Sequence, residues 1–271
     1  MLRICVLASG SGGNCTYVAS PKTAVLVDAG LSARDTMRRM DLAGIVPAGL
    51  RGILITHEHT DHTAGVSVLS RRHGIALYAN SGTIDGIERN PRMRTLQWNR
   101  FMTGAPFLID DLTIEPFSVP HDCYDPVGFV IHTNGTRVGV VTDMGMTTTL
   151  IRERLRQCHA LVIESNHDER LLMESDRPWT LKQRIRGSQG HLSNQHAAEL
   201  ISDVAGPELS HVFLAHLSEE CNIPEIAIEC TRQSLDAKGM THVAVHCTRQ
   251  DRPSNVWQQA TSATSVPVGD L

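Results

Sequence analysis

Residues 53–62 have the sequence Ile-Leu-Ile-Thr-His-Glu-His-Thr-Asp-His, in which three apolar residues run directly into a loop of histidines and acids. The apolar residues predict a buried strand, and the helical pattern that follows predicts that the loop leads into a helix. The metal-ligand residue types in the loop are His57, His59, Asp61 and His62. Imidazole and carboxylate groups suit zinc, manganese or iron. The loop contains no cysteine, which argues against a purely structural zinc site. The stretch therefore predicts a metal centre between a strand and a helix.

Three further metal-ligand residues follow apolar runs later in the chain, namely His121, Asp143 and His216. Taken singly, a strand-terminal Asp is most often a turn residue, and a lone His is more often satisfied within a core. At a strand end, however, a polar side chain can emerge into a cleft at the edge of a sheet. Together with the loop, these residues make a predicted set of seven ligands.

Short apolar runs alternate with helical patterns along most of the chain, which is typical of mixed α and β layers. Two β-rich halves predict an α+β sandwich of two sheets with helices outside. The chain has no evident interior linker, so residues 1–247 are expected to form one domain. Residues 248–271 are rich in Gln, Thr, Ser and Pro and are expected to be a loosely ordered tail. The expected strands are residues 2–7, 24–28, 52–56, 75–78, 112–119, 127–132, 137–142, 160–164, 211–215 and 242–246; the expected helices are residues 32–42, 63–72, 81–88, 147–157, 194–204 and 224–237.

Composition excludes several classes of protein. Hydrophobic content of 41% and charged content of 20% are those of a globular protein. No stretch approaches the roughly 18 apolar residues that span a bilayer, and the start of the chain lacks the pattern of a signal peptide, so we expect a cytoplasmic location without a membrane anchor. Seven scattered cysteines without a CxxC pair argue against a disulfide framework. A net charge of −4 requires any nucleic-acid contact to be local.

The ordered ligand set resembles that of the metallo-β-lactamase-fold hydrolase superfamily. The resemblance implies a four-layer αββα fold, in which two packed mixed sheets are flanked by helices. It also implies two divalent metal ions, zinc or manganese, with iron also acceptable. One ion would bind His57, His59 and His121; the other would bind Asp61, His62 and His216; Asp143 would bridge the two. Asp28, at the end of an earlier strand, would order the loop.

Two such ions imply hydrolysis by water whose pKa they lower. Asp61 is then a candidate catalytic residue, because it could bind metal and orient the resulting hydroxide. Two carboxylates and several neutral imidazoles leave the site net positive, which favours an anionic substrate such as a phosphodiester.

Three other segments bear on the substrate. They are the glycine-rich residues 9–14, the polar cluster at residues 164–168, and residues 181–194, where three cations precede Gly-His and a helix start. Each has an ordinary alternative as a hairpin connection, a solvated loop or a solvated helix face. From these segments the expected substrate-binding residues are Ser11, Asn14, Asn166, Lys182, Arg184, Arg186, Ser193 and Asn194.

Taken together, the segments resemble the WalJ (YycJ-type) exonuclease subgroup, which is related to tRNA 3′-processing and β-CASP nucleases but lacks the large insertion of the latter. The resemblance implies 5′→3′ exonuclease action on double-stranded DNA and possible mismatch-repair partners. It also implies that His191, with Glu164 or His167, contacts the scissile phosphate or protonates the leaving oxygen. No obvious substrate-binding arm is evident in the sequence.

Three alternatives stay open at this point. An RNA-processing nuclease would use the same metal set. A hydrolase of small esters, thioesters or lactams, of the glyoxalase II kind, predicts a dry apolar pocket in place of the cations at 182–186. A binding protein without catalysis predicts a broken ligand set, and no ligand position is missing here.

Overall fold

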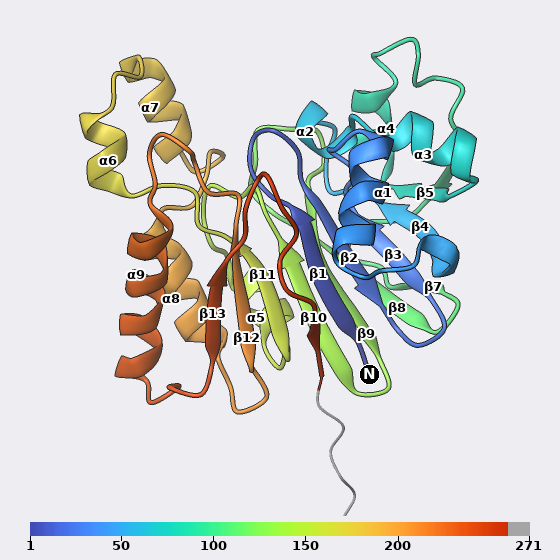
Figure 1. Ribbon diagram of the computed structural model, residues 1–271. Helices are drawn as coiled ribbons and strands as arrows, with labels where there is room; N and C mark the ends of the chain where they lie inside the picture. Colours follow the sequence, from blue (N-terminus) through green and yellow to red (C-terminus); the bar gives the residue numbers. More distant parts are fainter. Residues whose placement is uncertain (260–271) are drawn as a thin grey trace, which may run out of the picture.

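Two seven-stranded β-sheets lie face to face in the computed structural model, which describes residues 1–259 (Figure 1). The first sheet has the order β14 (Trp257–Gln258), β1 (Arg3–Ala8), β2 (Cys15–Ala19), β3 (Ala24–Val27), β4 (Leu50–Leu54), β5 (Ala76–Ala79) and β6 (Trp98–Arg100). The second has the order β13 (Ala244–Cys247), β12 (His211–Ala215), β11 (Ala160–Glu164), β10 (Thr136–Val141), β9 (Val127–Thr133), β8 (Leu112–Ser118) and β7 (Phe107–Ile109).

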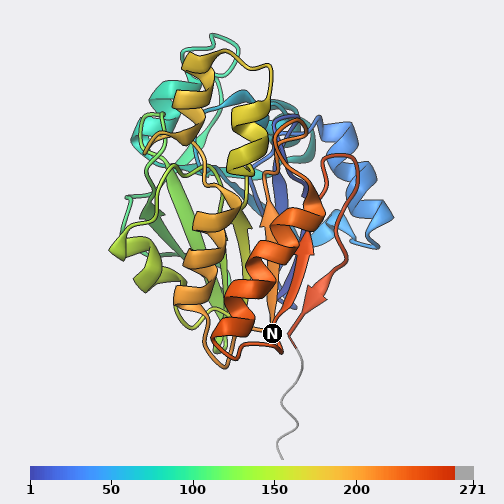
Figure 2. The same ribbon diagram turned by 90° about the vertical axis from the view of Figure 1, so that its left-hand side faces the viewer.

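Helices cover the outer face of each sheet, as Figures 1 and 2 show from two sides. On the first sheet lie α1 (Ala33–Leu42) and α3 (Val66–His73), near the short helices η1 (Pro47–Gly49), α2 (Thr60–Thr63) and α4 (Ser81–Ile87). On the second sheet lie α5 (Thr149–Leu155), α8 (Asn194–Val204) and α9 (Pro224–Ala237). Two more helices, α6 (Glu169–Glu174) and α7 (Trp179–Arg186), project beyond the sheets. The expected αββα architecture is confirmed.

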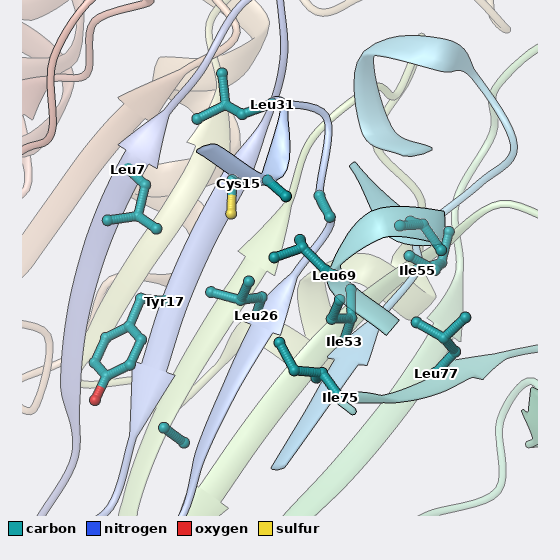
Figure 3. Packing of buried hydrophobic residues seen from close by; sticks show 14 of the residues in the cluster. Leu7, Cys15, Tyr17, Leu26, Leu31, Ile53, Ile55, Leu69, Ile75 and Leu77 are labelled. Atoms are coloured by element: carbon teal, nitrogen blue, oxygen red, sulfur yellow. The ribbon is translucent and has the colours of Figure 1, made fainter. Parts of the chain in front are cut away.

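Strand β1 shows how the sequence produces these layers. Its side chains alternate between the two faces, so Ile4 and Val6 pack between the sheets while Cys5 and Leu7 pack beneath the helices. Because both faces are buried, the strand is almost continuously apolar. Figure 3 shows the outer core of the first sheet, where Leu69 of α3 lies over the strands.

The segment after residue 247 differs from expectation. Residues 257–258 form β14, which pairs antiparallel with β1, and Trp257 is only 5% exposed. The polar composition was misleading because individual side chains of the segment bond to the domain: Ser254 Oγ accepts the Val6 N–H at 3.0 Å. The expected tail is therefore corrected for residues 248–259, and its remainder lies outside the described residues.

Parallel pairing determines where the polar loops meet. Strands β3 and β4 are parallel in the first sheet, and β10, β11 and β12 are parallel in the second. The carboxyl ends of parallel strands share one edge, so the loops that follow them gather at one end of the sandwich. Within residues 1–259, no helix has the length and apolarity needed to cross a lipid bilayer.

Candidate metal centre

The loop between β4 and α2 is held by Asp28 at the end of β3. One carboxylate oxygen of Asp28 accepts the Thr56 N–H, and the other accepts the Thr56 hydroxyl, both at 2.8 Å. The second oxygen also lies 2.8 Å from His62 Nδ1. This contact leaves Nε2 of His62 facing the interior of the site. Asp28 therefore orders the loop, as its position predicted.

The first ligand group consists of His57, His59 and His121, whose ligand atoms all lie within 4.8 Å of one another. His57 Nε2 is 3.1 Å from His59 Nδ1. His121 follows the end of β8 and reaches the group from the second sheet, with its Nδ1 3.0 Å from the Gly190 carbonyl. Burial, together with the neighbouring His62, holds the pKa of His57 well below its usual range, so this imidazole is neutral as a metal ligand must be.

The second ligand group consists of Asp61, His62 and His216, again with ligand atoms within 4.8 Å. The Asp61 carboxylate lies 3.5 Å from His62 Nε2 and 3.6 Å from His216 Nε2. Asp143 faces both groups: one oxygen is 3.2 Å from His62 Nε2, and the other is 4.0 Å from His121 Nε2. The structure thus brings together all seven residues that the sequence proposed as ligands.

Unpaired buried atoms test whether these residues suit a metal. Asp143 Oδ2 and His216 Nε2 are buried and have no hydrogen-bond partner among the described residues. A buried polar atom without a partner destabilises a fold, so such atoms call for a ligand. Although burial opposes ionisation of Asp143, His216 and His62 hold its pKa well below the usual range, which keeps it a carboxylate. A buried set of imidazoles and carboxylates with vacant lone pairs fits a divalent cation.

The backbone at three of these positions is strained. Asp28, Asp143 and His216 have φ of 62°, 56° and 54°, in the left-handed region that non-glycine residues rarely adopt. Each lies at or just beyond the end of a strand, where the turn directs the side chain toward the centre. Such strain costs on the order of 1–3 kcal/mol per residue and is typical of functional sites.

Glu164, the last residue of β11, is fully buried beside the second ligand group. Its Oε1 is 2.7 Å from His191 Nδ1 and 3.0 Å from His216 Nδ1, while its Oε2 accepts the N–H groups of Met144 and Leu192. Burial opposes ionisation, but His191 lowers the pKa of Glu164 to about 2. Because protein groups engage both oxygens and the residue is fully buried, Glu164 has the geometry of a residue that positions His191 and His216.

His191 is the candidate proton donor that the structure places best. Its Nδ1 is fixed by Glu164, its ring lies 3.8 Å from Asp143, and 23% of its side chain is exposed. Burial disfavours its charged form, but the Glu164 carboxylate raises the pKa of His191. His167, proposed for the same role, is buried and contacts none of the metal-ligand groups; it lines a surface pocket that His191 also lines.

The expected substrate-binding residues divide into those that line a pocket and those that do not. Ser11, Asn166 and Arg184 line a pocket of about 130 Å³ beside His191. Arg186 and Ser193 line a second pocket, on which His167 also borders. The guanidinium of Arg184 forms an ion pair with Asp122, next to the ligand His121.

Lys182 and Asn194 line neither of these two pockets, and both side chains are engaged inside the protein. The buried Lys182 donates its ammonium hydrogens to the carbonyls of Met173 and Ser175, at 2.7 and 2.6 Å. Buried Asn194 accepts a hydrogen bond from Ser165 Oγ at 2.6 Å and donates one to Asn222 Oδ1 at 2.8 Å. Both positions satisfy buried backbone or side-chain groups, a role that charge and polarity in the sequence do not distinguish from ligand binding.

Asn14, from the glycine-rich loop, lies at the metal centre instead of in a pocket. Its Nδ2 is 3.0 Å from His62 Nε2 and 3.4 Å from the Asp61 carboxylate. Its Oδ1 accepts the Ser9 hydroxyl at 3.1 Å, and the same hydroxyl oxygen accepts the His216 N–H at 2.7 Å. The loop therefore braces the second ligand group.

Sequence reasoning missed Gln250, which holds the glycine-rich loop. Its Oε1 accepts the Gly12 N–H at 2.8 Å, and its Nε2 donates to the Gly13 carbonyl at 3.1 Å. Buried Arg39 donates to the Gln250 carbonyl at 2.7 Å. A side chain at Gly10, where φ is 136°, would place its Cβ 2.7 Å from Gln250 Oε1. The positive φ, which residues with a side chain rarely adopt, explains the glycine, and no local pattern marks Gln250 as its neighbour.

The chain matches proteins of one superfamily. The Beta-lactamase superfamily domain matches residues 23–217. The chain is 37% identical to exodeoxyribonuclease YycJ of Bacillus anthracis over 88% of its own length and 90% of the relative's. It is 36% identical to exodeoxyribonuclease WalJ of Streptococcus pneumoniae over 82% and 84%.

Solved structures agree on the fold. The metallo-β-lactamase fold protein YhfI of Bacillus subtilis has a TM-score of 0.71 at 16% identity, covering 95% of this chain and 99% of that one. Zn²⁺-bound PqqB of Methylobacterium extorquens has a TM-score of 0.70 at 14% identity, covering 96% and 100%. With the ligand groups described above, these matches establish that the chain is a metal-dependent hydrolase of the metallo-β-lactamase superfamily and belongs to the family that contains YycJ and WalJ.

Proposed function

We propose that this protein is a dinuclear metal-dependent nuclease that degrades double-stranded DNA in the 5′→3′ direction. The observation that carries the proposal is the placement of Asp143 between two complete ligand groups. Relatives named exodeoxyribonuclease, 36–37% identical over more than four fifths of the chain, support DNA as the substrate. The direction and the duplex preference rest on the sequence resemblance.

Bound at these two groups, divalent ions would supply Lewis acidity and a lowered water pKa. Residues of the chain would orient the water and transfer the protons. Asp61, braced by Asn14, would orient the attacking water and accept its proton. Attack at phosphorus breaks the bond to the leaving oxygen, and His191 would give that oxygen a proton. The Glu164 carboxylate holds His191 through Nδ1 for this transfer.

The surroundings of the centre favour a phosphodiester over a small ester or thioester. The pocket beside His191 presents Ser11, Asn166, Arg177 and Arg184, which are polar or cationic. A thioesterase or lactamase of the alternative kind needs an apolar pocket there; in this one Leu181 and Ile185 are outnumbered by polar and charged side chains. Anionic oxygens match these donors. Mismatch-repair partners belong to the same proposal on family resemblance alone, and a cytoplasmic location is an expectation from the sequence pattern.

The decisive experiment uses purified protein, manganese or zinc, and duplex DNA labelled at the 5′ or the 3′ end. We expect early release of labelled mononucleotide from the 5′-labelled strand and gradual shortening of the 3′-labelled one. Single-stranded DNA, RNA and a thioester provide the other arms. Inactivity on DNA together with cleavage of RNA would favour the RNA-processing alternative. Inactivity on both nucleic acids, with turnover of the thioester, would refute a nuclease.

A further inference from the structure

A second pocket, of about 390 Å³, lies between α7 and the N-terminus of α8 and is called here the α7–α8 pocket. Its lining includes His167, Glu169, Arg186, His191, Ser193 and His196. His191 also lines the smaller pocket beside the metal centre, so the two pockets flank one residue of the proposed catalytic apparatus. The proposed mechanism makes no use of the α7–α8 pocket.

His167 provides the first sign that this pocket binds a ligand. The residue is 2% exposed, and its Nδ1 has no hydrogen-bond partner among residues 1–259. Its backbone is fixed, because the His167 carbonyl accepts the Asn194 N–H at 2.8 Å and the residue forms a β-bridge with Ser193. A rigidly held imidazole with an unpaired buried nitrogen is expected to find its partner in a bound molecule.

Arg186, the last residue of α7, provides the second sign that this pocket binds a ligand. The other arginines of the α6–α7 region form ion pairs: Arg170 with Glu174, Arg177 with Glu220 and Arg184 with Asp122. Arg186 is exposed and forms no ion pair within the described part of the chain; its guanidinium contacts only the sulfur of Met173, at 3.9 Å. Its charge is therefore available to the pocket.

The N-terminus of α8 opens on the same pocket. This helix has eleven residues and is capped by Ser193, whose Oγ accepts the His196 N–H at 3.3 Å. The positive end of a helix dipole favours an anion. Glu169 is the one acidic residue that lines the pocket in the described chain, and it is exposed in the first turn of α6, where solvent screens its charge. His167, His196 and Glu169 do not bring ligand atoms together as a metal site would.

We infer that the α7–α8 pocket binds a second phosphate group of the substrate strand, next to the phosphate that is cleaved. Arg186 and His167 bind its oxygens and the positive end of the α8 dipole favours its charge, while His191 serves the scissile phosphate alongside. This inference rests on the proposed nuclease function and adds a subsite to it. The phosphate has two chemical sources, a terminal monoester at the strand end or an internal diester.

The test measures the affinity of the manganese-loaded protein for short duplexes whose terminal linkages are phosphorothioates that resist cleavage. One duplex carries a 5′-phosphate and the other a 5′-hydroxyl. We expect Arg186→Gln to weaken binding roughly tenfold, as loss of a charge-assisted contact does, and to reduce the salt dependence by about one ion. His167→Asn tests whether the unpaired Nδ1 of His167 contributes to the affinity for these duplexes. Arg170→Gln is the matched control, because it removes an exposed, paired arginine of the same region and is expected to change affinity less than twofold.

The outcomes separate the possibilities. Loss of affinity for the phosphorylated duplex alone supports a terminal monoester, and equal loss for both duplexes supports an internal diester. Unchanged affinity in both Arg186→Gln and His167→Asn overturns the inference, as does an equal loss in Arg170→Gln. A wild-type protein that cleaves no DNA overturns the proposed function instead, so the two failures are distinguishable.

Discussion

The two sheets contribute to the metal centre in different ways. The first sheet supplies four ligands from one loop of six consecutive residues, 57–62, supported by Asp28. The second sheet supplies its ligands singly, from the ends of three strands, supported by Glu164. A site built from one loop is visible in a sequence, whereas a site distributed over strand ends depends on the whole fold. The contrast predicts that changes in the second sheet disturb the position of single ligands, while changes in the first disturb the loop as a unit.

The largest effect is expected from Asp143→Ala, which removes the carboxylate that faces both groups. Activity should fall at least about a thousandfold, because each of the two proposed ions would lose a ligand. Metal analysis of the purified variant should show a reduced content. Asp203→Ala, which removes an exposed acid on α8, is the control and should keep wild-type metal content. Normal metal content in Asp143→Ala would show that the carboxylate is not a ligand shared by the two metal-ligand groups.

The two supporting acids give the most direct comparison of the sheets. Asp28→Asn should lower metal affinity about 10- to 100-fold, because the loop and His62 lose their anchor. Glu164→Gln should lower kcat by a similar factor and KM little, because His191 loses its orientation. Metal titration and steady-state kinetics on both variants check this division. If both variants only lowered metal affinity, without a separate fall in kcat, the orientation of His191 by Glu164 would make no contribution of its own to activity.

A smaller effect is expected from Gln250→Ala, which releases the glycine-rich loop from the C-terminal segment. Two hydrogen bonds are lost, so the free energy of unfolding should fall by about 1–2 kcal/mol and activity several-fold. Gln250→Glu keeps the acceptor but not the donor and should retain part of the activity. Gln233→Ala, on the exposed face of α9, is the control for loss of a surface glutamine.

Lys182 and Arg184 separate structure from binding within α7. Lys182→Met leaves two carbonyls unpaired, so it should lower the free energy of unfolding by about 1–3 kcal/mol while KM for DNA stays unchanged. Arg184→Gln should do the reverse, raising KM with little loss of stability, because its side chain is exposed at the pocket. A raised KM in Lys182→Met at full stability would restore Lys182 as a substrate-binding residue.

The smallest effect is expected from Glu115 in β8, away from the centre. Burial opposes its ionisation, but hydrogen bonds from Arg137 and the charges of Arg137 and His132 lower the pKa of Glu115. Its folded pKa lies below the unfolded value, so its contribution is present at neutral pH and is lost as pH falls through the folded pKa. Denaturant unfolding at pH 7 and pH 4 should show a smaller pH-dependent loss in Glu115→Gln than in the wild type. Equal losses would show that the pairing adds no stability.

Most of the fold and the candidate ligands of the loop could be predicted from local signals, whereas the three strand-end candidates gained weight only as a set and through the family resemblance. Buried strands are apolar runs, and His121, Asp143 and His216 each stand where such a run ends. The orientation of a charged side chain is not a local property. Lys182 and Arg184 lie two residues apart on one short helix, yet one is buried against carbonyls and the other faces a pocket. Strand β14 was missed because two residues in a polar segment carry no periodic pattern.

The contact between Gln250 and the glycine-rich loop also bears on how the molecule comes to be assembled. The hydrogen bond from Gly12 to Gln250 joins positions 238 residues apart. Contacts of such long sequence separation form slowly, and during synthesis the loop emerges long before its partner does. The loop that carries Asn14 to the second ligand group therefore reaches its final form only after residue 250 is available. A nascent chain would hold the three histidines of the first group earlier than it holds a finished site, and metal captured at that stage would lack the second group.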